Sequence, residues 1–193
     1  MSADPFLDRV FKNLPNYSGK FTYKAWQYNN RPTSEGVGIL PLAGVDVDKM
    51  AARIMDVAGY KGNIDYVEES RVIKDNMPES VHFYQRIKVP VLAQIQMELV
   101  LTDFGERDGW RVLAWHQLDA ETLKLDTKKG ARSEYNVGAW LLKDDRVAYA
   151  LSSAPRKEDV GRLKFKALTK GADAGATSVL KNNIEGMFRW SKR

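Results

Sequence analysis

The chain of 193 residues contains two histidines, His82 and His116, and no cysteine. Any histidine that acts as a general base or a metal ligand must therefore be one of these two. The strand register described below places them on the same outer face, two strands and four residue steps apart. That separation exceeds about 13 Å along the strands, which is too far for one shared metal ion. We expect two surface histidines and no metal site.

Sequence signatures of the common enzyme classes are also missing. The chain has no Gly-x-Ser-x-Gly elbow, no His-Glu-x-x-His zinc motif and no phosphate-binding glycine loop. The pair Gly36-x-Gly38 lacks the third glycine of a dinucleotide fingerprint and does not open a helix. The absence of cysteine excludes disulfides, thiolate zinc sites and thiol nucleophiles. We expect no catalytic residue, no metal and no cofactor.

Arg86, Glu98 and His116 fall in one predicted row across three strands. On the outer face such a row is solvated and contributes little to stability. A one-residue slip at the Pro90 turn would move the row to the inner face, where it could anchor a polar head group or polarise a carbonyl. We expect the exposed arrangement and keep Arg86, Glu98 and Arg132 as candidate polar anchors.

The composition is typical of one folded domain, because 44% of the residues are hydrophobic and 28% are charged. No signal peptide is visible, and no apolar run approaches the roughly 18 residues of a membrane helix, so we expect a cytoplasmic protein. The net charge of +5 is uneven, because residues 156–193 hold ten Lys/Arg and four Asp/Glu. A solvated basic face and a surface for anionic membrane both fit this bias. A nucleic-acid partner is not expected, because no recognition motif is present.

Apolar periodicity and turn residues predict the helices that would position these side chains. Asp4-Pro5 is suited to open the first helix, with Asp4 as its cap. Asp46 is the expected cap of the second helix, and Gly59 is placed to end it. The expected helices cover 4–14, 46–58 and 173–191.

Between these helices the pattern is that of strands joined by turns, with a longer connection at 118–133 where 122–126 could form a short strand. Residues 154–170 are ambiguous, since 161–168 fits either a strand or the start of a helix. The expected strands cover 19–28, 36–42, 64–74, 80–89, 95–104, 110–117, 134–142 and 147–153.

Three turns set which residues of the sheet face each other. They lie near Leu92, at 105–109 and at Asp144-Asp145, and they predict the pairs Phe83–Leu101, Leu101–Leu113 and Trp140–Tyr149. One face thereby collects the apolar residues of all three hairpins. We predict an α+β fold in which a curved antiparallel sheet wraps around a long C-terminal helix. Gln85, Gln117 and Asn136 on this face would be satisfied internally or aimed at a ligand.

Several segments, taken in order along the chain, resemble the START domain family, the lipid-transfer branch of the helix-grip (SRPBCC, Bet v 1-like) superfamily. These segments are Gly36–Pro41, Asp56–Tyr60, Tyr66–Ile73, His82–Pro90, Gly130–Arg132 with Gly138–Leu142, and the terminal helix. The resemblance implies a ligand-binding domain at 19–193 behind a helical extension at 1–18, with an internal hydrophobic cavity that the C-terminal helix gates. The family's Arg-Asp pair at the central hairpin is absent, because Val89-Pro90 is followed by Gln94-Ile95.

These patterns predict a protein that binds and transfers a hydrophobic small molecule (a lipid, a sterol or a polyketide-like compound) without catalysis. The alternative is a cyclase or hydrolase that uses the same cavity, since helix-grip proteins include aromatic polyketide cyclases. The basic C-terminal part would contact anionic membrane. The residues predicted to line the cavity are Phe83, Gln85, Ile87, Met97, Leu99, Leu101, Leu113, Trp115, Gln117, Asn136, Trp140, Tyr149, Ile184, Met187 and Phe188.

Overall fold

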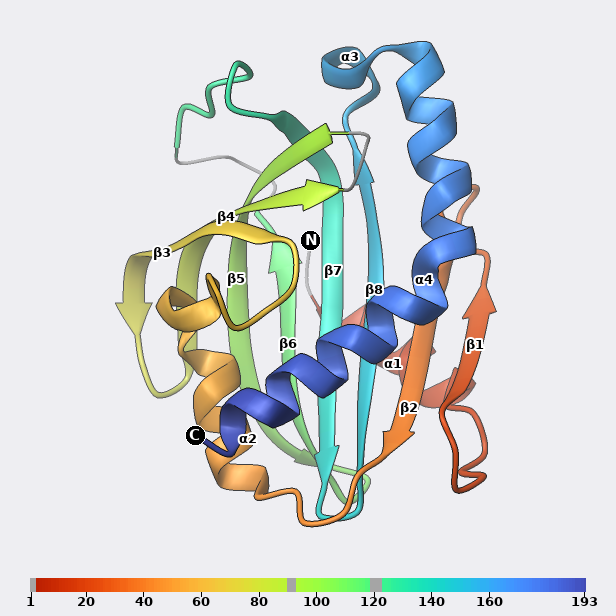
Figure 1. Cartoon of the computed structure of the whole chain (residues 1–193), viewed down its shortest axis with the longest axis vertical. Coiled ribbons are helices and arrows are strands. Elements are labelled where there is room, and N and C mark those ends of the chain that lie inside the picture. Colours follow the sequence, from red (N-terminus) through yellow and green to blue (C-terminus); the bar gives the residue numbers. More distant parts are fainter. Residues whose placement is uncertain (1–2, 90–92, 119–122) are drawn as a thin grey trace.

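The computed structural model describes residues 3–89, 93–118 and 123–193. Its centre is an eight-stranded sheet with the order β1-β2-β8-β7-β6-β5-β4-β3 (Figure 1). Neighbouring strands are antiparallel, and the first residues of β5 also pair in parallel with the first residues of β7, which curls the sheet at that end. The strands are β1 (Thr22–Trp26), β2 (Glu35–Pro41), β3 (Val67–Asn76), β4 (Ser80–Val89), β5 (Ala93–Arg107), β6 (Trp110–Gln117), β7 (Ala131–Lys143) and β8 (Arg146–Pro155).

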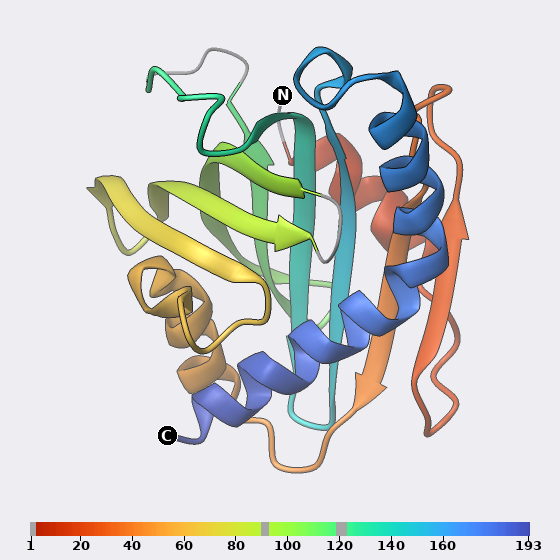
Figure 2. The same ribbon diagram turned by 45° about the horizontal axis from the view of Figure 1, so that its top comes forward.

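Helices cover both faces of the sheet. The long helix α4 crosses the concave face and α1 lies against the opposite, convex face (Figures 1 and 2). Alternate residues of β7 therefore enter two different cores: Trp140 and Leu142 face α4, whereas Ala139 and Leu141 lie on the side of α1. The helical elements are α1 (Asp4–Asn13), α2 (Val47–Met55), the 3-10 turn η1 (Val57–Tyr60), α3 (Lys157–Val160) and α4 (Arg162–Ser191). The predicted α+β class, a curved sheet around a C-terminal helix, is confirmed.

The strand register agrees with the prediction at one hairpin and differs at two. Trp140 pairs with Tyr149 as predicted. In the other hairpins Phe83 pairs with Leu99, and Leu101 pairs with Trp115, so each predicted pairing is wrong by two residues. A bulge between Asp103 and Gly105 reduces the second shift from three residues near the turn to two, whereas the Pro90–Leu92 turn lies outside the described residues. A shift of two preserves which face each side chain occupies.

The two histidines are closer than predicted. Both His82 and His116 pair with Val100, so they lie in one row across β4, β5 and β6. Their backbones are two strand spacings apart, about 10 Å, instead of more than 13 Å. Within the described ranges no group of three or more His, Cys, Asp or Glu side chains is placed to hold an ion.

The ends of the helices agree with some of the predicted capping and terminating residues and differ from others. Asp46 caps α2 as predicted, because its side chain accepts a hydrogen bond from the Lys49 amide at 3.0 Å. Asp4 does not cap α1; it is the first helical residue and follows Ala3, which makes no side-chain cap. Helix α2 ends at Met55, and Gly59 lies in η1, where a β-carbon would approach the Trp190 ring to 2.6 Å. Close packing against Trp190 therefore explains this glycine.

The ambiguous segment before the last helix is helical. Residues 162–168 form the start of α4, which begins eleven residues before the predicted start. Gly161, with φ +76°, separates α4 from the short helix α3. Of the predicted strand at 122–126, residues 123–126 are not in a strand, and 119–122 lie outside the described residues. No helix in the described ranges is long and apolar enough to cross a membrane.

Candidate functional site

A cavity of about 120 Å³ lies between the concave face of the sheet and the second half of α4. Its floor is made of buried side chains of the central strands, among them Leu99 and Leu101 of β5. Its roof is made by three residues of α4, Val179, Asn183 and Met187. The walls are mostly hydrocarbon and aromatic, so the cavity is suited to an apolar molecule.

Three aromatic rings form a continuous wall in this cavity. The Tyr149 ring lies 4.3 Å from the Trp140 ring and stacks on the Trp115 ring at 5.5 Å between centroids. Trp115 lies flat across β7 because Gly138 leaves the space, since a β-carbon at position 138 would come within 2.1 Å of the indole. The glycine therefore determines the shape of the cavity wall.

The polar groups deep in the cavity are neutral. Trp115 Nε1 donates to Asn136 Oδ1 at 2.7 Å, and Asn136 Nδ2 lies 3.2 Å from Met97 Sδ. Asn136 is thus satisfied by protein atoms, one of the two roles predicted for it. Burial raises the pKa of Tyr60 and of Tyr149, so both phenols stay protonated at physiological pH. No charged side chain reaches this depth among the described residues.

Ten of the fifteen residues predicted to line a cavity line this one: Phe83, Gln85, Ile87, Leu99, Leu101, Trp115, Asn136, Trp140, Tyr149 and Met187. Met97, Leu113 and Ile184 belong to the surrounding core, and Phe188 packs against it half-buried. Gln117 lines a neighbouring polar hollow.

Sequence reasoning missed the segment Tyr60–Val67, the roof residues Val179 and Asn183, and the pair Leu151 and Ser153. The sequence could have indicated Leu151 and Ser153, because they follow Tyr149 at intervals of two residues along β8 and therefore lie on the same face of the sheet.

Two of the three candidate polar anchors lie on the convex side of the sheet. Arg86 donates to Gln94 at 2.6 Å and pairs with Glu69 at 3.3 Å. Glu98 faces away from the cavity as expected, but it is 1% exposed, so the predicted solvated row is wrong. Its carboxylate lies 2.6 Å from His82 Nε2 and accepts from the Leu123 amide, because the connection after β6 covers it.

Arg132, the third candidate anchor, lines a polar hollow of about 510 Å³ that shares Asn136 with the apolar cavity. Its backbone amide, Nε and Nη2 each donate to Asp159 of α3 at 2.8 Å. These bonds lower the pKa of Asp159, so the carboxylate remains ionised. Arg132 therefore fastens α3 to the first residues of β7.

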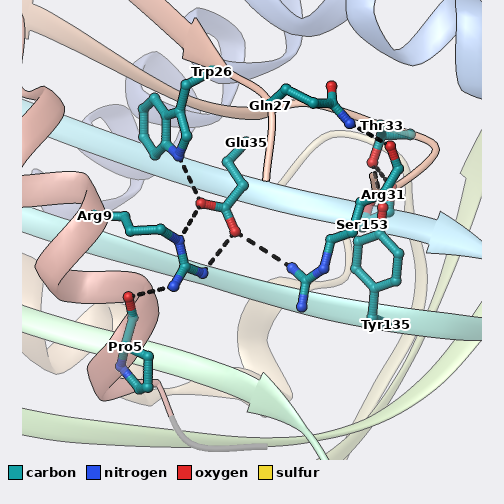
Figure 3. Close-up of polar contacts among 9 residues, drawn as sticks. All are labelled: Pro5, Arg9, Trp26, Gln27, Arg31, Thr33, Glu35, Tyr135 and Ser153. Atoms are coloured by element: carbon teal, nitrogen blue, oxygen red, sulfur yellow. Dashed lines mark hydrogen bonds and ion pairs between the residues drawn. The ribbon is translucent and has the colours of Figure 1, made fainter. Parts of the chain in front are cut away.

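A second buried polar cluster lies on the convex face, under α1 (Figure 3). Glu35 is fully buried and accepts from Arg9 at 2.7 and 2.8 Å and from Trp26 Nε1 at 2.7 Å. Arg31 approaches the same carboxylate to 3.4 Å. The hydrogen bonds to Glu35 raise the pKa of Arg9. The cluster lies on the side of the sheet opposite α4 and joins α1 to β1 and β2, so we assign it a structural role.

No family profile and no curated protein sequence matches the chain. The fold, in contrast, resembles solved structures. A fragment of a STAR-related lipid transfer protein from Xanthomonas axonopodis superposes with a TM-score of 0.74 at 13% identity, over 93% of this chain and 97% of the other. Human STARD10 superposes with a TM-score of 0.75 at 11% identity, over 100% of this chain and 82% of the other.

An enzyme also has a similar fold. The Zhui aromatase/cyclase of a Streptomyces species superposes with a TM-score of 0.52 at 12% identity, over 90% of this chain and 94% of the other. The chain therefore has the START-like helix-grip fold that its sequence predicted. At such identities a shared fold leaves the function open, because function depends on the site.

Proposed function

We propose that this protein binds one hydrophobic small molecule between its sheet and α4, and carries it without changing it. The observation that supports this most is the wall of Trp115, Trp140 and Tyr149 around an apolar space. Burying apolar ligand surface there is worth about 25 cal/mol per Å². The binding domain would span 19–193 behind an extension at 1–18, whose helix α1 packs on the convex face, and the proposed location is the cytoplasm.

The size of the cavity requires an element that lines it, above all α4, to move when a ligand binds, whereas the described residues of the connection at 118–133 do not line it. About 120 Å³ is close to the space that holds one benzene-sized molecule, whereas pockets for larger ligands measure roughly 300–1,000 Å³. Helix α4 bends before it crosses the sheet (Figure 1), and Gly171 and Gly175 weaken its first half. We infer that displacement of the roof residues of α4 admits the ligand.

A polyketide cyclase or hydrolase is the alternative function, since the Zhui aromatase/cyclase shares the fold. Such chemistry needs an acid or base in contact with the substrate. Asp65, at the rim, is the only ionised group among the described residues that line the cavity, and the phenols of Tyr60 and Tyr149 stay protonated. This lining favours the carrier over the enzyme.

Native mass spectrometry of the purified protein, followed by solvent extraction, tests the carrier function. We expect a stoichiometric apolar adduct, either as purified or after incubation with mixed lipid vesicles. The extracted compound should be chemically unchanged after repeated incubation. A mass without adduct under both conditions, or conversion of the compound, would contradict the proposal.

Membrane contact is the second part of the proposed function. The first half of α4 exposes Leu163 (86% exposed) beside Lys164, Lys166 and Lys170. Each Lys near an anionic surface contributes to binding, so replacing these three with glutamine should slow transfer to anionic vesicles about tenfold. A fluorescent sterol, dehydroergosterol, would report the transfer.

The matched control replaces Lys12, Lys20 and Lys24 with glutamine, which removes the same charge from the N-terminal part. Transfer by the control should stay within about twofold of wild type, as should transfer to neutral vesicles by either variant. Equal slowing by both triple variants would mean that net charge alone, and not this helix, attracts the membrane.

A further inference from the structure

The described residues that line the cavity include one acidic side chain and no basic side chain. The half-buried and exposed lining residues form a rim that includes Asp65, Tyr66, Gln85 and Asn183. Among the described lining residues Asp65 carries the only ionised group, and none is Lys, Arg or His. The molecule as a whole is basic, with a net charge of +5, so the absence of a cation from this rim is a local property of the site.

A ligand with a negative end gains no ion pair at this rim. The cations of β4, Arg86 and Lys88, alternate with the lining residues Gln85 and Ile87 and so face the opposite side of the sheet, where Arg86 pairs with Glu69 and Gln94. Arg132 is held by Asp159. An anionic group seated at the rim would lose hydration and meet the carboxylate of Asp65. A neutral end would keep its hydrogen bonds, because the amides of Gln85 and Asn183 can both donate and accept.

The backbone at the rim is held in place. Tyr66 has φ +67°, and the other non-glycine residues with positive φ in the described ranges are Asn29, Asn30 and Asp108, types that tolerate this conformation. The Tyr66 carbonyl accepts a hydrogen bond from the Lys88 amide of β4 at 2.8 Å. This bond holds the backbone of Tyr66 beside β4 and thereby places Asp65 at the rim.

We propose that the cavity selects an uncharged amphipathic molecule, with an apolar body and a neutral hydrogen-bonding end such as a hydroxyl, and that Asp65 discriminates against carboxylates and phosphates. The inference rests on the proposed function, because it names the class of ligand for the same cavity.

The test compares two probes with the same chain, dodecan-1-ol and dodecanoate, at pH 7.4. Each displaces 1,6-diphenylhexatriene, an apolar dye without polar groups, from the full-length protein. We expect dodecanoate to bind at least about tenfold more weakly than the alcohol. Asp65→Lys should reduce this ratio about tenfold, with Asp65→Asn in between. Asp144→Lys, the same charge change at the β7–β8 turn, should leave the ratio unchanged.

The outcomes separate the inference from the function on which it rests. If the dye binds but the two probes bind equally, or if Asp65→Lys leaves the ratio at its wild-type value, the inference is overturned and the carrier function stands. If Asp144→Lys changes the ratio as much as Asp65→Lys, net charge and not the rim discriminates, which also overturns it. If the dye does not bind, both the carrier function and the inference fail.

Discussion

Glu35→Gln is expected to lower the free energy of unfolding by about 3 kcal/mol, because it leaves the partly buried guanidinium groups of Arg9 and Arg31 without the buried carboxylate that faces them. The Glu35 carboxylate is fully buried and holds Arg9 through two short hydrogen bonds, with Arg31 on its other side. A glutamine keeps the size of the side chain but loses the charge and one acceptor oxygen. Since Arg9 belongs to α1, the loss should also loosen this helix from the convex face.

Urea denaturation of the two proteins measures this difference, and hydrogen exchange of the α1 amides shows where it acts. Asp8→Asn is the matched control in the same helix, because the Asp8–Arg107 pair is exposed. Asp8→Asn should lower the free energy of unfolding by less than about 1 kcal/mol. Equal stability of Glu35→Gln and wild type would mean that the buried cluster of Figure 3 contributes no net stability.

The importance of Glu35 could not be read from the sequence. Residues 31–36 have the composition of a turn, and a glutamate in a turn is usually solvated. Its burial depends on α1, which lies 26 residues away along the chain at Arg9 and packs on the convex face. Glu98 was misjudged for the same reason, since the connection after β6 covers an outer face that strand alternation alone marks as exposed.

The part of the site that follows from strand periodicity was predictable. Alternation has a period of two, so the errors of two residues at the β4–β5 and β5–β6 pairings left every side chain on its predicted face. Leu99 and Trp115 therefore line the cavity although their predicted partners are wrong. The rim at 60–67 and the roof on α4 depend on how helix and sheet approach each other, which no local pattern encodes.

A disulfide that ties α4 to β2 is expected to slow ligand uptake at least about 100-fold, because the roof must move before a large molecule can enter. A β-carbon at position 38 would lie 3.5 Å from the β-carbon of Leu180, within the range of disulfides. The variant is Gly38→Cys with Leu180→Cys, and Phe21→Ala removes the ring whose edge lies 2.8 Å from the new β-carbon. The chain has no other cysteine that could compete for the bridge.

Uptake of dehydroergosterol from neutral vesicles, before and after oxidation, measures the effect, and a reductant should restore the original rate. Phe21→Ala with Leu180→Cys alone is the control, since it has the same packing loss and cannot form the bridge. Position 180 lies next to Val179, one turn before Asn183 and two turns before Met187, so the bridge holds the helix directly above the cavity. If a fully bridged protein takes up the sterol at the rate of the reduced form, α4 is not the gate. Another element of the lining, such as the segment 60–67, would then have to open, because about 120 Å³ cannot hold a sterol.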